Sequence, residues 1–352
     1  MDQLSALSSM DRRETRRRRW LYVVAAAALV VTPWIAHRAA NVRTMTGRIS
    51  VDTGCRSDSS TTADMAGLMP GASPIRCEAW DVGTGVTGYV WRAPHARAVV
   101  LLQTGWGDYA QRYVNQGGGL IPRLLARSIS VYAFDMWGSG RSPGARGATP
   151  LREAVADHIA ARRALREQAL PVFVLGHSVG GLVTATSALG DQTRLGGMIL
   201  IAPALDWNVP AVMRLVARIG GFLAPTLAVP GTGGWDGVTR DPEARQRLNN
   251  DSLVYHGGLS WITASSGTAV SRENWARYRE LRVPILVVHG SDDESPDPSS
   301  SRAFVGVVSS PDKTLTIIPG GLHALLDDKV SGQTLDVIVG WLDRHLQSPV
   351  SR

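Results

Sequence analysis

The sequence is poor in the residues that bind metal ions. Its 352 residues include two cysteines and eight histidines, and their spacing matches no zinc-binding pattern. The Gly-rich segment 135–142 lacks both the Lys-Ser/Thr ending of a P-loop and a G-x-G-x-x-G pattern, which favours a tight structural loop over a phosphate site. The sequence therefore predicts neither a metal ion nor a cofactor.

Beyond the N-terminus the chain has little excess positive charge, although its formal net charge is +7. Residues 1–43 contain eight arginines against three acidic residues, whereas the rest of the chain has 29 basic and 27 acidic residues. A nucleic-acid-binding domain usually carries its excess charge on the folded surface. We therefore expect no nucleic-acid partner.

The one long apolar run is N-terminal. Residues 20–36 carry no charge, and these 17 residues are at the short end of what spans a bilayer. Four arginines precede the run, with Trp20 and Trp34 near its two ends, as expected for a segment oriented with its basic flank inside. We predict a basic cytoplasmic tail (1–19), an uncleaved transmembrane signal anchor (20–36) and a catalytic domain outside the cytoplasmic membrane.

Two alternatives to the anchor remain open. The first is a cleaved signal peptide, after which the protein would be secreted. The paired arginines before residue 20 would suit export by a twin-arginine exporter. His37 and Arg38 interrupt the sequence where an A-x-A cleavage site would be expected. The second alternative is a buried helix, which the basic flank and terminal position disfavour.

Residues 37–74 form a predicted linker, which is rich in Thr, Ser, Gly and Asp from residue 41 onward. Cys55 and Cys77 lie near the two ends of this lead-in. In an oxidising compartment they would form a disulfide. Two free thiols are the alternative.

From residue 75 onward, short apolar strands alternate with helices, which is typical of an α/β fold with a mostly parallel sheet covered on both faces. We predict a core of residues 75–205 and 283–347. The expected strands are 75–82, 85–93, 98–103, 130–134, 172–175, 198–201, 283–289 and 314–318, and the expected helices are 111–127, 151–168, 182–189, 299–308 and 330–346. Ligands of such sheets bind beyond the carboxyl ends of the strands.

The alternation stops between residues 206 and 282. One stretch, 209–229, is apolar with helical spacing, and a second apolar piece covers 251–261. We interpret this insert as a lid that presents an apolar channel to an acyl chain. In the alternative interpretation, its apolar residues only pack the insert onto the core; they include Val212, Leu215, Val216, Ile219 and Phe222.

The most informative stretch is residues 171–181, where an apolar strand ends in Gly176-His-Ser-Val-Gly180 and a helix follows. G-x-S-x-G between a strand and a helix is the nucleophile elbow, a sharp turn that exposes the serine hydroxyl. Ser178 is therefore the predicted nucleophile. The amide of Val179, at the start of the helix, is a predicted oxyanion donor.

A serine nucleophile needs a base, and the base needs an orienting carboxylate. His323 lies in a loop between the last predicted strand and the final helix, where Gly320 and Gly321 allow the chain to bend, and it is the predicted base. Four acidic residues crowd the loop 291–297 after the preceding strand. The second predicted oxyanion donor is the amide of Trp106, in the Gly-rich loop 104–109.

These motifs resemble those of the α/β-hydrolase superfamily, and specifically its monoacylglycerol lipase and lysophospholipase branch, the serine aminopeptidase-like hydrolases. The resemblance covers roughly residues 75–347. It implies Ser178 as nucleophile, His323 as base and Asp293 as acid, with Asp297 as a second acid of the same loop. The lid segments 240–243 and 251–257 are also similar to that branch. The usual H-G-x-G-E-H loop is Thr-Gly-Trp-Gly-Asp-Tyr here.

We expect a membrane-anchored serine ester hydrolase that acts through an acyl-enzyme. The resemblance implies that it cleaves monoacylglycerols or lysophospholipids. A short-chain carboxylesterase or a peptidase on the same fold is the nearest alternative. A non-catalytic lipid-binding protein of the cell envelope is the alternative from another functional class, and it would not need an intact triad.

Overall fold

Eight strands of the described chain form one sheet in the order β1-β2-β4-β3-β5-β6-β7-β8. The pairs β1–β2 and β2–β4 are antiparallel, and all other neighbouring pairs are parallel. The sheet is therefore mostly parallel, as predicted. The strands are β1 Glu78–Asp81, β2 Thr87–Trp91, β3 Ala98–Gln103, β4 Ile129–Phe134, β5 Val172–His177, β6 Leu195–Ile201, β7 Ile285–Gly290 and β8 Lys313–Ile318.

This computed structural model describes Cys55 and residues 75–234 and 237–347. The predicted tail (1–19), the predicted membrane segment (20–36) and nearly all of the predicted linker lie outside the described residues. Among the helices that are described, none is long and apolar enough to cross a bilayer.

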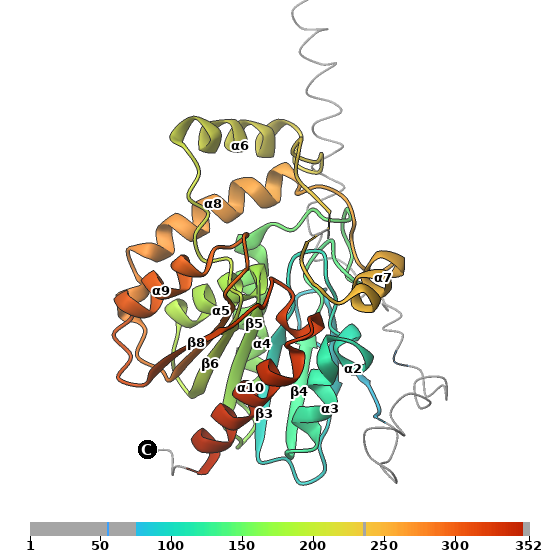
Figure 1. Ribbon diagram of the computed structural model, residues 1–352, viewed down its shortest axis with the longest axis vertical. Helices are drawn as coiled ribbons and strands as arrows, with labels where there is room; N and C mark the ends of the chain where they lie inside the picture. Colours follow the sequence, from blue (N-terminus) through green and yellow to red (C-terminus); the bar gives the residue numbers. More distant parts are fainter. Residues whose placement is uncertain (1–54, 56–74, 235–236, 348–352) are drawn as a thin grey trace, which may run out of the picture.

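Two hydrophobic layers lie on opposite faces of the sheet, because successive residues of a strand point to opposite sides. In β3, Val99 and Leu101 belong to one layer, while Val100 and Leu102 belong to the other. Figure 1 shows helices over both faces. The first layer is covered by α4 Leu151–Leu165, α5 Val179–Gly190, α8 Trp261–Trp275 and α9 Pro298–Val307, and the second by α3 Leu120–Leu125 and α10 Ser331–Gln347.

The predicted continuous helix 111–127 was wrong. The segment consists of α2 Arg112–Asn115, a 3-10 turn η3 Gly117–Gly119, and α3. All three glycines of the turn have a positive φ, between 57° and 68°. A right-handed helix cannot continue through this conformation, which glycine adopts readily, so the chain bends here.

In the described chain, the segment between β6 and β7 contains the α-helices α6 Ala211–Leu223, α7 Pro242–Asn250 and α8, followed by the 3-10 turn η4 Tyr278–Glu280. Helix α6 packs along α8 at the outer end of the molecule (Figure 1), where a Cβ at Gly220 would lie 2.4 Å from the Trp261 ring. Helix α7 begins where Asp241 accepts hydrogen bonds from the amides of residues 243 and 244, with Pro242 as its first residue.

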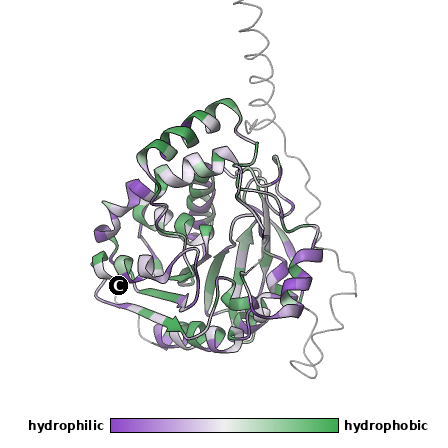
Figure 2. Ribbon diagram, turned by 45° about the horizontal axis from the view of Figure 1, so that its top comes forward, coloured by the Kyte–Doolittle hydropathy of each residue, from purple (hydrophilic) through white to green (hydrophobic). Residues whose placement is uncertain are grey.

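The outer face of α6 exposes many apolar side chains, and Figure 2 shows this helix as mostly hydrophobic. Between 39% and 64% of each apolar side chain is exposed for Val212, Met213, Leu215, Val216, Ile219, Phe222 and Leu223. These residues are therefore not buried between the insert and the core. The second apolar piece, 251–261, is mostly irregular and contacts the loop after β3, where the amide of Tyr255 donates to Gly107 O at 2.8 Å.

Cys55 and Cys77 form a disulfide. The two sulfur atoms lie 3.7 and 3.8 Å from Nε2 of Gln111, and both cysteines pack against the second hydrophobic layer. The disulfide thus attaches the start of the described chain near the loop that follows β3.

Candidate active site

Ser178 occupies a sharp turn between β5 and α5, with φ 54° and ψ −123°. Its backbone is fixed by β6, because Ser178 N donates to Ile201 O and Ala204 N donates to Ser178 O, each at 3.0 Å. The turn has no room for side chains beside the serine: a Cβ at Gly176 would lie 2.5 Å from Gly180 O, and one at Gly180 would lie 2.3 Å from Thr104 O. This crowding explains the two glycines, and it presents Ser178 at the carboxyl edge of the sheet.

The structure brings Ser178, His323 and Asp293 together from three different loops. His323 Nε2 lies 2.8 Å from Ser178 Oγ, and His323 Nδ1 lies 2.8 Å from Asp293 Oδ2. Because a carboxylate only accepts hydrogen bonds, Nδ1 carries the proton and Nε2 is free to accept one from the serine hydroxyl. This arrangement is the one required for a histidine to act as a general base toward a serine.

Asp293 is the only buried residue among the acidic side chains of the loop 291–297. Asp292 is exposed and pairs with Arg240 at 2.6 Å. Asp297, the second acid implied by the resemblance, is exposed and caps α9 by accepting from Ser299 N at 2.7 Å. The structure therefore places Asp293 at the base and gives Asp297 a contact with the start of a helix.

His289 is a further partner of Asp293 that the sequence did not reveal. Its Nε2 lies 3.1 Å from Asp293 Oδ2 and 2.9 Å from Pro296 O, so this nitrogen carries a proton. Burial acts to raise the pKa of Asp293, but hydrogen bonds from His289 and His323 outweigh burial and hold this pKa well below its ordinary value. Asp293 is thus a carboxylate at neutral pH.

The backbone on both sides of His323 is fixed by hydrogen bonds. The preceding amide, Leu322 N, donates to Asp328 Oδ2 at 3.0 Å, and the following amide, Ala324 N, donates to Val238 O at 2.8 Å. Val238 belongs to the insert. The insert therefore contributes directly to the placement of the histidine loop.

His177 lies directly beside His323, with ring centroids 5.2 Å apart. Its Nε2 lies 3.3 Å from His323 O. Burial and then the neighbouring His323 ring lower the pKa of His177 to about 4. His177 is therefore neutral at physiological pH and adds no positive charge next to the base.

The loop after β3 closely approaches Ser178. A Cβ at Gly105 would lie 3.4 Å from Ser178 Cβ, so the next residue, Trp106, follows immediately beside the serine. Val179 is the first residue of α5, and first-turn amides have no acceptor within their helix. Both predicted oxyanion donors thus belong to segments that flank Ser178.

Known proteins that are similar to this chain identify its family. Residues 94–330 match the family model described as serine aminopeptidase, S33. The chain belongs to this family. Its fold is the α/β-hydrolase fold, and the predicted resemblance to the monoacylglycerol lipase branch is confirmed.

Several relatives of this S33 hydrolase are similar over most of their length. A monoacylglycerol lipase of Mycolicibacterium smegmatis is 32% identical over 255 residues, which are 71% of this chain and 89% of the relative. A monoglyceride lipase of Homo sapiens is 29% identical over 65% of this chain and 76% of the relative. The crystal structure of Paleococcus ferrophilus monoacylglycerol lipase superposes with a TM-score of 0.66 at 28% identity, covering 76% of this chain and 99% of that chain.

In this S33 hydrolase, the loop after β3 is held by aromatic contacts with the insert. The indole Nε1 of Trp106 donates to Gly147 O at 3.0 Å, and its ring meets that of Tyr255 edge-on at 5.3 Å. Tyr109 OH donates to Asp251 Oδ2 at 2.7 Å. Trp106, at the variable position of the usual family pattern, and Tyr109, where that pattern has a histidine, therefore both contact the segment 251–258.

Asp108, in the same loop, forms a buried charge network. Arg112 donates to both of its carboxylate oxygens, at 2.8 and 2.7 Å, and to Asp327 Oδ2 at 2.7 Å. Burial acts to raise the pKa of Asp108, but Arg112 outweighs burial and the pKa is lowered. The network ties the loop after β3 to Asp327, four residues after the base.

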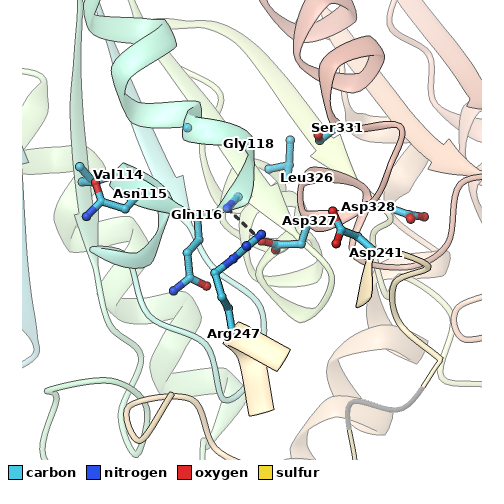
Figure 3. A pocket seen from close by; sticks show the side chains of 12 residues that line it. Val114, Asn115, Gln116, Gly118, Asp241, Arg247, Leu326, Asp327, Asp328 and Ser331 are labelled. Carbon is cyan, nitrogen blue, oxygen red and sulfur yellow. Dashed lines mark hydrogen bonds between the residues drawn. The ribbon is translucent and has the colours of Figure 1, made fainter. Parts of the chain in front are cut away.

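Asp327 also lies in a polar pocket of about 210 Å³ between the 3-10 turn η3 and α7 (Figure 3). There it accepts a hydrogen bond from Gly117 N at 2.9 Å. None of Ser178, His323 and Asp293 lines this pocket. In the described part of the chain, no group of three or more His, Cys, Asp or Glu side chains is arranged to hold a metal ion.

The Gly-rich segment 135–142 is held by hydrogen bonds to its first residue, Asp135. Asp135 accepts from Tyr89 OH at 2.7 Å and from the amides of Ala110 and Arg141 at 2.9 Å each. A Cβ at Gly140 would lie 2.1 Å from the Asp135 carboxylate. The segment therefore supports the loop after β3 through Ala110.

Proposed function

We propose that this S33 hydrolase cleaves single-chain lipid esters, monoacylglycerols or lysophospholipids, through Ser178, His323 and Asp293. The observation that carries the proposal is the pair of 2.8 Å contacts that link the three side chains at the carboxyl edge of the sheet. Relatives named monoacylglycerol or monoglyceride lipases, similar over most of their length, support the substrate class.

The reaction follows from which atoms carry protons. His323 Nε2 takes the hydroxyl proton as Ser178 Oγ attacks the ester carbonyl, and Asp293 stabilises the imidazolium that forms. The imidazolium then gives its proton to the departing alcohol oxygen, which leaves an acyl-enzyme. Water, deprotonated by the same histidine, attacks the acyl carbonyl and releases the fatty acid.

Negative charge that develops on the carbonyl oxygen needs preorganised donors. The amides of Val179 and Trp106 would supply them, one from the start of α5 and one from the loop that abuts Ser178. Removing one such donor typically costs about 10²–10³ in kcat. Both donors are backbone groups, so the indole of Trp106 does not prevent this role.

The insert would act as a lid that meets the lipid surface. Its outermost helix, α6, presents the exposed apolar face described above, far more apolar than a water-facing helix needs. Contact with lipid would cover this face. The predicted N-terminal anchor (20–36) would hold the catalytic domain at the same membrane.

We further propose that the catalytic domain lies outside the cytoplasm, anchored by residues 20–36. The disulfide between Cys55 and Cys77 supports this, since disulfides persist in oxidising compartments. Protease added to intact cells should remove the catalytic domain but leave the N-terminal tail protected, and intact-mass analysis should show an uncleaved N-terminus. Protection of the catalytic domain from protease in intact cells would contradict the proposed orientation.

The substrate proposal is tested by a hydrolysis profile of the full-length protein in detergent, with Ser178→Ala as the blank. The panel contains long-chain monoacylglycerols, lysophospholipids, short water-soluble esters and aminopeptidase substrates. Preference for the long-chain single-acyl lipids is expected. Activity confined to short esters or to peptides would keep the triad and reject the lipid assignment.

A further inference from the structure

The segment 238–241, here called the strap, lies in the insert just before α7, and its four residues are Val238, Thr239, Arg240 and Asp241. It contacts the chain around the base at several points. Val238 O accepts from Ala324 N, and Arg240 N donates to Asp328 Oδ1 at 3.0 Å. Thr239 Oγ1 donates to Asp327 O at 2.9 Å. The strap is therefore attached to the residues that follow His323.

Arg240 extends these contacts to two loops at once. Its guanidinium donates to Gly320 O, in the loop that carries His323, and to Asp292 Oδ2 at 2.6 Å, next to Asp293. One side chain of the insert thus bridges the loop of the base and the loop of the acid.

The bridge is part of a closed ring of hydrogen bonds. Ser291 Oγ donates to the other carboxylate oxygen of Asp292 at 2.5 Å and accepts from Gly320 N at 2.8 Å. The series of hydrogen bonds therefore leads from the Gly320 carbonyl through Arg240, Asp292 and Ser291 back to the Gly320 amide. A planar guanidinium can satisfy two acceptors with fixed geometry, which an ammonium group cannot match.

We infer that Arg240 is a positioning residue, which holds the loops of His323 and Asp293 in register and makes that register depend on the insert. This inference rests on the proposed function. Arg240 is 46% exposed and Asp292 44%, so the pair contributes little to the free energy of unfolding. Catalysis is far more sensitive to position, since a displacement of about 1 Å can cost about 10²-fold in rate.

The test compares Arg240→Gln, Arg240→Lys and Asp292→Asn in the full-length protein, with a water-soluble short-chain ester as substrate and Ser178→Ala as the blank. Arg247→Gln is the matched control. Arg247 lies in the same insert, is 50% exposed, and pairs with Glu243 one helical turn away at 3.6 Å. Among the described residues, Arg247 forms no hydrogen bond with the loop of His323 or the loop of Asp293.

For Arg240→Gln we expect kcat to fall by about tenfold or more, with KM within about twofold and an unchanged melting temperature. Arg240→Lys should recover part of the loss, because lysine keeps the charge. Adding Asp292→Asn to Arg240→Gln should cost little more, since both changes open the same ring. Arg247→Gln should behave as wild type.

Equal activity of the Arg240→Gln and Arg247→Gln proteins would overturn the inference. So would a fall in kcat that is accompanied by a fall in melting temperature and that is as large in Arg240→Lys as in Arg240→Gln. Both results would leave the proposed function standing if Ser178→Ala abolishes turnover. A wild type that turns over neither this ester nor a long-chain monoacylglycerol, or an active Ser178→Ala protein, would instead reject the proposed function, and the role of Arg240 with it.

Discussion

Replacement of Asp293 by asparagine tests the geometry of the site most severely. In the wild type, Oδ2 of Asp293 receives N–H donors from His323 at 2.8 Å and from His289 at 3.1 Å, while Oδ1 receives Ser295 N at 3.0 Å. Every partner is a donor. An asparagine has only one acceptor oxygen, so one of its two ends must face a donor with its own NH₂ group.

Either orientation of the amide is costly. If the oxygen faces the histidines, the NH₂ group opposes Ser295 N–H, and the imidazolium of the transition state has lost its carboxylate. If the NH₂ group faces them, His323 must move its proton to Nε2, which can then no longer accept from Ser178. We expect kcat to fall by about 10³–10⁴, or about 4–5.5 kcal/mol in the barrier.

The assay is ester hydrolysis at saturating substrate, with Asp297→Asn as the control in the same loop. Asp297 caps α9 but has no contact with His323, and asparagine caps a helix as well as aspartate does, so its replacement should leave stability nearly unchanged and cost less than about twofold in kcat. Retention of a tenth of the activity by Asp293→Asn, or an equal loss from Asp297→Asn, would refute the assignment of the acid.

Three further predictions concern stability. His177 has a folded pKa of about 4, so the unfolded chain takes up this proton first as the pH falls below about 6.5. The contribution of His177 to the free energy of unfolding should therefore drop by about 2 kcal/mol between pH 7 and 5, and His177→Gln should remove this part of the drop in denaturant titrations. An equal drop in the wild type and the variant would contradict the prediction. Gly180→Ala should destabilise by about 1–3 kcal/mol and impair activity, whereas Gly190→Ala in the same helix, with no atom closer than 3.6 Å, should do neither. Cys77→Ser should lower the free energy of unfolding by about 3 kcal/mol, since the bridge spans a sequence separation of 22; an unchanged denaturation midpoint would contradict this.

The sequence predicted those features that depend on local pattern. Ser178 could be located because the G-x-S-x-G turn must follow a buried strand and precede a helix, and His323 because it follows the last strand. The identity of the acid could not be predicted from spacing alone, since four carboxylates share one loop and spacing does not show which of them is buried. The resemblance indicated Asp293, and the structure places it 2.8 Å from the base.

Features that depend on packing between distant segments escaped prediction. His289 was assigned only to a strand, although its ring bonds Asp293 from the end of β7. The bend at Gly117–Gly119 was missed because the flanking residues have helical spacing. The start of α7 at Asp241-Pro242 was not predicted, and the neighbouring Arg240 gains its role only when the insert folds back onto the loops of His323 and Asp293.

The most direct test of the central claim is labelling with a fluorophosphonate, which forms a covalent bond with an activated serine. The account predicts one adduct per folded chain, mapped by mass spectrometry to Ser178 and absent from the Ser178→Ala and His323→Ala proteins. Folded wild-type protein that takes up no label, or takes it up at another residue, would contradict the claim and favour a lipid-binding protein that has kept the fold without the reaction.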